Sequence, residues 1–170
     1  MFGHTSAAHL NPAVTLCFYV MGDITFPMLA NYLLAELVGS ILGFGVLMML
    51  TPESIYSKQP GLCCTVPHQT VSDFQAFSVE FISTAFLILL VCSCSDPRNS
   101  KKQDSAPLKF GILIAALSLI AGPYTGASMN PTRSFAPAFW SQVWTSHWVR
   151  TLMLLHPQLP ISIRVPEYNV

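Results

Sequence analysis

Three long apolar segments constrain this chain more than any other feature of its sequence. They cover residues 24–50, 74–95 and 106–122, and each contains a single charged residue. A helix of about 20 apolar residues crosses a hydrocarbon core of roughly 30 Å, so each segment is close to the length of a bilayer span. None alternates between polar and apolar residues as a barrel strand does. We therefore expect an all-α membrane protein with three transmembrane helices in this chain.

The composition supports this class. Charged residues make up only 9% of the 170 residues, and the formal net charge is zero. Ordinary soluble domains are roughly 25% charged, so a soluble domain of this composition would have too little charge to cover its surface. A chain without net charge gives no reason to expect a nucleic-acid partner. The expected partner is the lipid bilayer.

The two linkers between the spans differ in basic residues. Residues 51–73 contain one lysine, Lys58, whereas residues 96–107 contain Arg98, Lys101 and Lys102. Basic residues concentrate in the short loops on the cytoplasmic side of a membrane. The second linker is therefore predicted to be cytoplasmic and the first to lie outside.

The polar residues of the chain form no recognisable cofactor-binding, metal-binding or catalytic motif. The five cysteines are odd in number; Cys63 and Cys64 are adjacent, and Cys92 and Cys94 lack the second pair of ligands that a zinc site needs. Free thiols are therefore expected rather than a disulfide framework. Without a nucleophile–base pair or a phosphate-binding loop, we expect no enzyme, no cofactor and no metal.

A short motif occurs twice, with the three spans between its copies. His9-Leu10-Asn11-Pro12-Ala13-Val14-Thr15 resembles Ser128-Met129-Asn130-Pro131-Thr132-Arg133-Ser134, and small residues precede each copy. An odd number of crossings brings the second copy into the membrane from the opposite side. This pattern is typical of an inverted repeat built on broken helices.

The Asn-Pro pair has a local meaning in each copy. Asparagine is a preferred N-cap and proline is favoured at the first helical position, so helices are predicted to begin at Asn11 and Asn130. Each following apolar stretch has about ten residues, roughly 15 Å, which is half of a bilayer. Either motif alone could be an ordinary turn or helix start. Two copies at this spacing favour two half-helices that meet near the midplane.

Two facing helix N-termini predict a pore for small uncharged polar molecules. Each N-terminus carries about half a positive charge and several unpaired N–H groups, which disfavours cations and hydronium. Irregular backbone leading into the helices is tolerated at membrane depth only where it lines a water-filled path. The residues predicted at the midplane are Asn11, Pro12, Ala13, Asn130, Pro131 and Thr132.

These residues resemble the two pore loops of the aquaporin (major intrinsic protein) family. The strings that match are residues 6–15 and 124–135, and the resemblance extends from about residue 3 to about residue 149. It implies a multi-pass helical bundle of six spans and two half-helices, in the plasma membrane and assembled as a homotetramer. It assigns a first pore loop and half-helix to residues 3–22, span 3 to 24–50, span 4 to 74–95, span 5 to 106–122, and a second pore loop and half-helix to 123–140.

The resemblance also implies a selectivity filter. Arg133 matches the family's filter arginine; the alternative for such a residue is an arginine that reaches the membrane interface. Water-selective members have a histidine twelve residues before the second Asn, where this chain has Ser118, and often a cysteine three before it, where this chain has Ala127. Residues 134–137 continue as in water-channel-type members. We therefore predict a water-channel backbone with a widened filter that admits glycerol or urea as well as water.

Three further residues receive roles from the resemblance. Glu80 matches a buried glutamate that accepts hydrogen bonds from pore-loop N–H groups, a scaffold role rather than a transport role. His9 matches a histidine near the cytoplasmic vestibule, with a hydrogen-bonded structural histidine as the equal alternative. Glu36 is expected to be a polar group in helix packing, next to a small-x-x-x-small pair, Gly39 and Gly43. Thr132 stands where the family usually has alanine, and its hydroxyl either narrows the midplane or bonds back to the helix.

The resemblance stops before the end of the chain. Spans 1 and 2 are expected to be missing, and residues 144–149 resemble the beginning of span 6. Residues 150–170 contain three prolines, which argues against a long helix, and are predicted to be a divergent tail. The leading prediction is a passive channel for water and small neutral solutes. The alternative is a non-conducting truncated form that associates with full-length channel subunits.

Overall fold

The computed structural model describes residues 7–58 and 61–146, and every helix or strand element in these ranges is helical. The tail predicted for residues 150–170 lies outside the described residues. The all-α fold class is confirmed. The elements are α2 (Pro12–Met21), α3 (Phe26–Leu50), α4 (Glu53–Tyr56), α5 (Asp73–Ser95), the 3-10 helix η1 (Pro97–Ser105), α6 (Ala106–Thr125) and α7 (Pro131–Ser141).

Helices α3, α5 and α6 are long and apolar enough to cross a membrane. They contain 25, 23 and 20 residues, respectively, and each has an 18-residue window of high hydropathy with few charges. They fall on the three apolar segments of the sequence. Helix α6 extends three residues past the expected end, through Pro123, and stops at Gly126, which has a φ of +81°.

Local signals set the ends of the spans. Ser72 and Gln75 form a capping box at the start of α5: the Ser72 hydroxyl accepts from the Gln75 N–H, and the Gln75 side chain accepts from the Ser72 N–H. After α5, the partly exposed Asp96 pairs with the exposed Arg98, with Nη2 and Oδ2 2.5 Å apart. That arginine lowers the pKa of Asp96 to about 2. The polar turn η1 then reverses the chain into α6.

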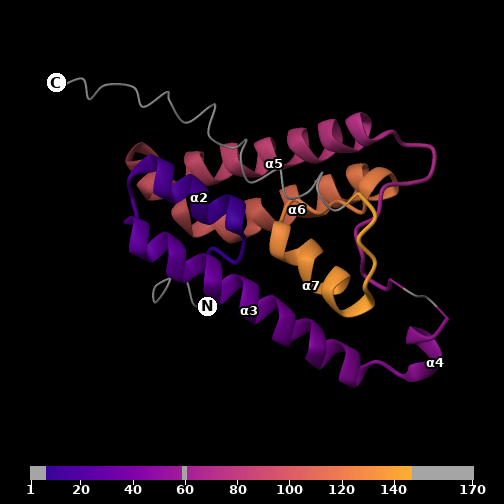
Figure 1. The fold of residues 1–170 in the computed structure, drawn as a ribbon. Coiled ribbons are helices and arrows are strands. Elements are labelled where there is room, and N and C mark those ends of the chain that lie inside the picture. Colours follow the sequence, from indigo (N-terminus) through magenta and orange to yellow (C-terminus); the bar gives the residue numbers. More distant parts are fainter. Residues whose placement is uncertain (1–6, 59–60, 147–170) are drawn as a thin grey trace, which may run out of the picture.

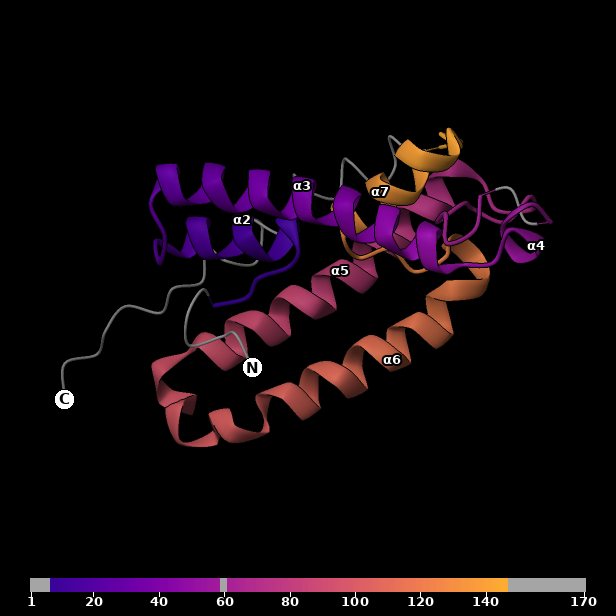
Figure 2. The same cartoon turned by 90° about the horizontal axis from the view of Figure 1, so that it is seen from below.

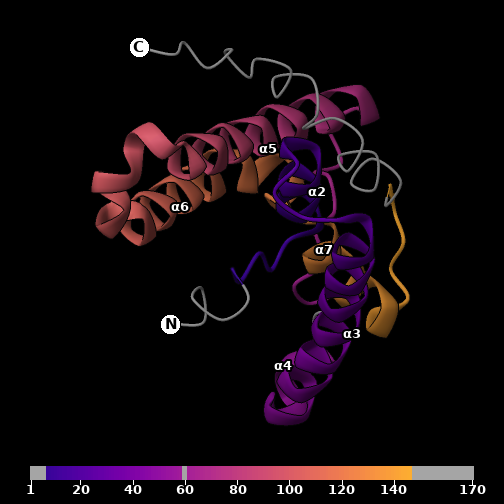
Figure 3. The same ribbon diagram turned by 90° about the vertical axis from the view of Figure 1, so that its left-hand side faces the viewer.

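The helices form two antiparallel pairs, and α7 packs along α3 (Figure 1). Helices α2 and α3 make one pair, and α5 and α6 make the other. Seen from below, the α2–α3 pair lies over the α5–α6 pair (Figure 2). An end view shows the two pairs diverging, with α2 and α7 near the point where they meet (Figure 3). The two short helices thus contact each other where the two pairs meet.

Helix α5 contributes to both apolar clusters of the described core. Its Leu87 packs with residues of α6 and the segment before α7, whereas Ile88 and Val91 pack with Ala13 and Cys17 of α2. The outward faces of the long helices carry exposed leucine, isoleucine, valine and phenylalanine side chains. Such faces suit a lipid environment, in which apolar side chains need no burial inside the protein.

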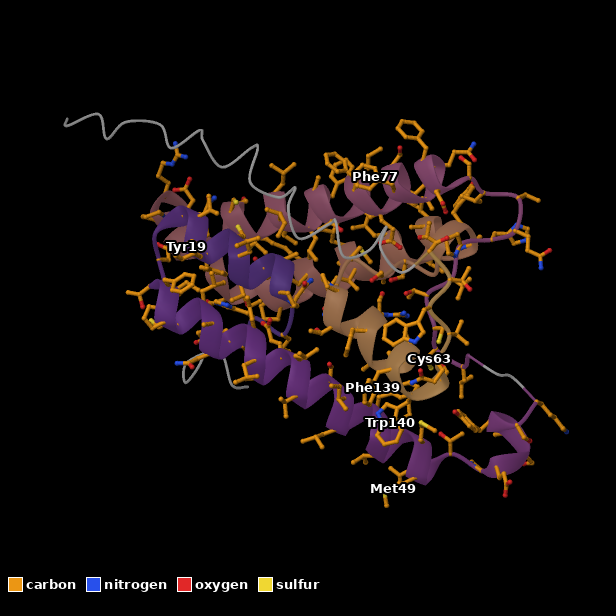
Figure 4. The ribbon with its side chains drawn as sticks, in the orientation of Figure 1. Tyr19, Met49, Cys63, Phe77, Phe139 and Trp140 are labelled. Atoms are coloured by element: carbon orange, nitrogen blue, oxygen red, sulfur yellow. The ribbon has the colours of Figure 1, made fainter. Side chains whose placement is uncertain are left out.

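Helix α7 packs closely along α3 through one glycine. A Cβ added at Gly45 would lie 3.0 Å from the Trp140 ring, and the Trp140 indole N–H donates to the Ile41 carbonyl at 3.0 Å. Figure 4 shows Phe139 and Trp140 beside α3, while Met49 points away from the bundle. The expected packing pair, Gly39 and Gly43, has no described atom within 4 Å of an added Cβ. Close packing in this part of the chain therefore uses Gly45.

Candidate functional site

The two Asn-Pro motifs begin helices α2 and α7. Asn11 and Asn130 both have extended backbones, with φ near −150°, and each is followed by a proline in the first helical turn. The Asn11 Oδ1 accepts from the Ala13 N–H at 3.0 Å. The Asn130 Oδ1 accepts from the N–H groups of Thr132 and Arg133 at 3.1 and 3.3 Å. Both asparagines are thus N-caps in the geometry that the sequence predicts.

The two helix N-termini meet through a reciprocal pair of hydrogen bonds. The Asn11 Nδ2 donates to the Met129 carbonyl at 2.8 Å, and the Asn130 Nδ2 donates to the Leu10 carbonyl at 2.8 Å. The partners are 118 and 120 residues apart in the sequence. Each asparagine therefore caps its own helix with its oxygen and holds the opposite motif with its nitrogen.

The backbone leading into each helix repeats as well. We call residues 7–11 loop B and residues 126–130 loop E. Counting back from each asparagine, the fourth, third and first preceding residues all lie in the left-handed region of φ. These are Ala7 (55°), Ala8 (49°) and Leu10 (56°) in loop B, and Gly126 (81°), Ala127 (49°) and Met129 (48°) in loop E. Left-handed residues other than glycine cost of order 1–3 kcal/mol each, so surrounding contacts must hold both loops in place.

Glu80 of α5 holds loop E. Its side chain is fully buried, and both carboxylate oxygens are occupied. Oε1 accepts from the Ser128 N–H at 2.9 Å and from the Thr125 hydroxyl at 2.6 Å, while Oε2 accepts from the Met129 N–H at 3.0 Å. The two bonds from loop N–H groups are of the kind that the family resemblance implies, and the bond from the Thr125 hydroxyl is additional.

Glu36 of α3 makes the corresponding contact with loop B. Its Oε1 accepts from the Asn11 N–H at 3.1 Å and from the Thr15 hydroxyl at 2.7 Å. Its Oε2 is buried and has no hydrogen-bond donor among the described residues. The sequence predicted only a role in helix packing for Glu36 and did not predict these contacts with loop B. A lone carboxylate inside an apolar span was the available signal, since such a group is paired or functional.

His9 lies in loop B, between aromatic rings. Its imidazole stacks on Phe18, with ring centroids 4.4 Å apart, and on Tyr32, at 4.7 Å. The Nδ1 atom lies 3.2 Å from the Thr15 hydroxyl. The ring is thus enclosed and hydrogen-bonded at the point where α2 packs on α3, while its role in a vestibule remains a prediction.

A buried hydroxyl cluster attaches loop E to the segment before α5. The Thr65 hydroxyl lies 2.6 Å from the Ser134 hydroxyl, which is also bonded to the Ser128 hydroxyl. Gly126 lies against the same segment, because a Cβ at that position would be 2.9 Å from the Thr65 Cα. No spacing pattern in the sequence predicts this cluster, because its residues come from three separate segments.

The three predicted filter residues are placed differently. The Arg133 Nη1 donates to the Cys63 carbonyl at 3.3 Å, and Cys63 lies close to α7 (Figure 4). Ala127 is buried in the cluster that includes Leu117. Ser118 follows Leu117 on α6 and is exposed. The structure therefore gives Arg133 a carbonyl partner, and the assembly of the three residues into a filter remains a prediction.

The hydroxyl of Thr132 has a partner that neither expectation included. It donates to the Asn130 Oδ1 at 2.9 Å instead of bonding to a helix carbonyl. Asn130 Oδ1 therefore accepts three hydrogen bonds, which fix the plane of its amide. That plane determines the direction in which the Asn130 N–H groups point.

The N-termini of α2 and α7 bring positive electrostatic potential to the place where loops B and E meet. The N-termini of α2 and α7 each present backbone N–H groups and about half a positive charge. Each asparagine amide also has a second N–H besides the one given to the opposite loop. In the part of the chain that the structure describes, no three His, Cys, Asp or Glu side chains gather as a metal site. The arrangement can donate hydrogen bonds to an uncharged oxygen and disfavours a cation.

Known proteins are similar to this chain in sequence and in fold. The model of the family "Major intrinsic protein" matches residues 1–154. The lens fiber major intrinsic protein of Gallus gallus is 40% identical over 147 residues, covering 86% of this chain and 55% of that protein. Aquaporin-4 of Bos taurus is 37% identical over 148 residues, covering 87% and 45%, respectively. The chain thus spans about half the length of these curated relatives.

A solved structure agrees on the fold. The aquaglyceroporin from Plasmodium falciparum superposes with a TM-score of 0.75 at 22% sequence identity. The superposition covers 94% of this chain and 72% of that chain.

Proposed function

This chain belongs to the major intrinsic protein family, and from that premise we propose that it is a subunit of a passive transmembrane channel for water. The observation that carries the proposal is the reciprocal bonding of Asn11 to Met129 and of Asn130 to Leu10. It brings the N-termini of two half-length helices together inside an apolar bundle. The proposal involves transport without catalysis.

The facing N-termini would select against charge. A water molecule at the midplane needs a donor for its oxygen, which the second N–H of each asparagine can supply. A hydronium or metal ion would instead meet the positive ends of α2 and α7. Asn11, Pro12, Ala13, Asn130, Pro131 and Thr132 would form this midplane, with Glu80 and His9 supporting the loops.

We propose that the filter also admits small neutral solutes such as glycerol or urea. Arg133, Ala127 and Ser118 would line it. Serine is smaller than histidine, so a filter with Ser118 would be wider and would offer a solute hydroxyl fewer steric contacts. The bond from Arg133 to the Cys63 carbonyl supports the placement of the guanidinium beside the loop that precedes α5.

We further propose that the working form is a homotetramer in the plasma membrane. The alternative function is a non-conducting form that associates with full-length channel subunits. The exposed apolar faces of α3 and α6 are compatible with either assembly, because both need apolar surface against lipid or a neighbouring helix.

Stopped-flow light scattering of liposomes that contain the chain tests the proposal. In a sucrose gradient, we expect the liposomes to shrink fast as water leaves. In a separate glycerol gradient, we expect shrinkage followed by fast re-swelling as glycerol enters. Ser118→His should slow glycerol entry and leave water flow nearly unchanged. Ser57→His, at an exposed position after α4, is the matched control and should change neither rate.

The outcomes separate the two functions. Water flow equal to that of empty liposomes, from a chain that is inserted and helical, would overturn the channel proposal for this chain. Co-purification with a full-length family member would then support the alternative. Equal glycerol rates for the wild-type chain and Ser118→His would overturn the filter proposal alone.

A further inference from the structure

Two thiols meet where the first half-helix packs on span α5. The Sγ atoms of Cys17 on α2 and Cys92 on α5 are 3.7 Å apart, and both cysteines are free. They are separated by 75 residues in the sequence. Neither has a part in the proposed channel mechanism.

We propose that Cys17 and Cys92 form a redox-active pair that closes into a disulfide and ties α2 to α5. A disulfide needs its sulfurs about 2.05 Å apart, so closure requires side-chain rotation and a small approach of the two helices. The two helices already pack together here through Ala13, Ile88 and Val91. Disulfide formation therefore needs only a small change in a helix contact that already exists.

The oxidant that this pair would use is a small disulfide such as glutathione disulfide. The Cys92 thiolate attacks one sulfur of the oxidant, forming a mixed disulfide and releasing one thiolate. Cys17, having lost its proton, then attacks the Cys92 sulfur and displaces the second small thiol. Two protein thiols and one small disulfide thus become one protein disulfide and two small thiols.

Exposure favours this order of attack. Cys92 is partly exposed and lies three residues before the end of α5, whereas Cys17 is buried at 1%. The following linker is predicted to be cytoplasmic, where glutathione keeps thiols reduced under ordinary conditions. Disulfides in that compartment are usually transient and redox-sensing. The pair would accordingly be open at rest and close under oxidative stress.

A disulfide between Cys17 and Cys92 would link the two helices that position loops B and E. Helix α2 begins at Asn11 of loop B, and α5 carries Glu80, which holds loop E. A covalent bond between these helices would limit movement of one loop against the other. The consequence is a bundle that resists thermal unfolding more strongly when oxidised.

Mass spectrometry of the whole 170-residue chain in lipid nanodiscs tests the proposal directly. The chain is treated with glutathione disulfide, its free thiols are alkylated with iodoacetamide after unfolding, and it is then digested. A peptide that links Cys17 to Cys92, with a loss of two hydrogens, is expected and should disappear with dithiothreitol. The thermal unfolding midpoint should rise on oxidation and return on reduction.

Cys94 provides the matched control. It lies two residues beyond Cys92, about 200° around the helix, so Cys94→Ser should leave the linked peptide unchanged. Cys92→Ser should abolish it and leave Cys17 alkylated.

Two results would overturn the proposal, and both are readable without any flow measurement. One is full alkylation of Cys17 and Cys92 in a sample whose exposed Cys63 has taken up glutathione. The other is a linked peptide whose fragment ions place the bond to Cys17 at Cys94 as often as at Cys92.

Discussion

Loops B and E share a backbone conformation but differ in how they are held. Both have left-handed residues at the same three positions before an N-capping asparagine. Loop E is held by both oxygens of a fully buried Glu80 and by a buried hydroxyl cluster. Loop B is held by one oxygen of Glu36, while the other oxygen has no donor among the described residues. An internal repeat can thus preserve a conformation while its two supports diverge.

The difference follows from where each carboxylate meets its loop. Glu80 reaches two consecutive N–H groups, those of Ser128 and Met129, as well as the Thr125 hydroxyl. Glu36 reaches one N–H group, that of Asn11, and one hydroxyl, that of Thr15. Hydrogen bonds to a charged group are worth about 1.5–3 kcal/mol each. Loop E should therefore depend on its carboxylate more than loop B does.

The largest expected effect is that of Glu80→Gln. The amide would place an N–H group against the N–H of Met129 or Ser128, leaving a buried donor unpaired. We expect a loss of roughly 3 kcal/mol of unfolding free energy, measured by thermal denaturation in detergent, together with loss of water flow. Glu53→Gln, at an exposed position on α4, is the control. A stable and conducting Glu80→Gln chain would show that loop E is held mainly by its hydroxyl cluster.

The next effect concerns the position four residues before each asparagine. Gly126→Ala should destabilise the chain by about 2 kcal/mol, because φ is +81° and the new Cβ would meet the Thr65 Cα at 2.9 Å. Ala7→Gly, at the same place in loop B, should instead stabilise it by about 1 kcal/mol. Thermal denaturation measures both.

Gly111→Ala is the control for Gly126→Ala. Gly111 lies on α6, and a Cβ added there would have no described atom within 4 Å. Changes of the same sign at Ala7 and Gly126 would show that the backbone similarity of the two loops does not extend to their energetics.

The two asparagines should differ by a smaller amount. Asn130→Ala removes three accepted hydrogen bonds and one donated bond, whereas Asn11→Ala removes one of each. With about 1 kcal/mol for each lost cap, we expect Asn130→Ala to cost more than Asn11→Ala in unfolding free energy. Asn31→Ala, at an exposed position on α3, should be neutral. The opposite ranking would contradict the stronger anchoring of loop E.

Glu36→Gln should have a modest effect. The amide oxygen can accept the bonds that Oε1 now accepts, and the amide nitrogen replaces an oxygen without a described partner. We expect a loss of about 1 kcal/mol, smaller than that of Glu80→Gln, because bonds to a neutral amide are weaker than bonds to a carboxylate. A loss as large as that of Glu80→Gln in the same denaturation assay would mean that both loops depend equally on their carboxylates.

The smallest effect is expected outside the membrane, at Asp96. Arg98 lowers the pKa of this carboxylate to about 2, so its favourable contribution is present above the ordinary pKa of 3.8 and is lost as the pH falls toward 2. Arg98 is exposed and Asp96 partly exposed, so water weakens the pair. Asp96→Asn should lower the unfolding midpoint slightly near neutral pH and not at all below about pH 2. An equal difference at both pH values would exclude the ion pair as its cause.

Local patterns predicted the helices and the meeting of the two half-helices, and the family resemblance implied the contacts of Glu80 with loop E. The other long-range contacts were not predicted. Hydropathy placed the three spans, and the Asn-Pro pairs placed the starts of α2 and α7, because capping and apolar length are properties of short segments. The partner of Glu36 depends on how α2 folds back on α3, and that of Thr132 on the amide plane of Asn130. Spacing alone favoured Gly39 and Gly43 for close packing, whereas Gly45 meets Trp140, since spacing does not say which face a neighbour occupies.

The reciprocal asparagine bonds also set an order for the making of the protein. Asn11 leaves the ribosome 118 residues ahead of Met129, its acceptor. Until loop E has been made, the Asn11 amide and the Leu10 carbonyl lack these partners. They then lie near lipid, which offers no hydrogen bonds. The contact between the two loops can therefore form only after loop E has been made. Errors in the synthesis or insertion of α3 to loop E should therefore leave the polar groups of loop B without their partners.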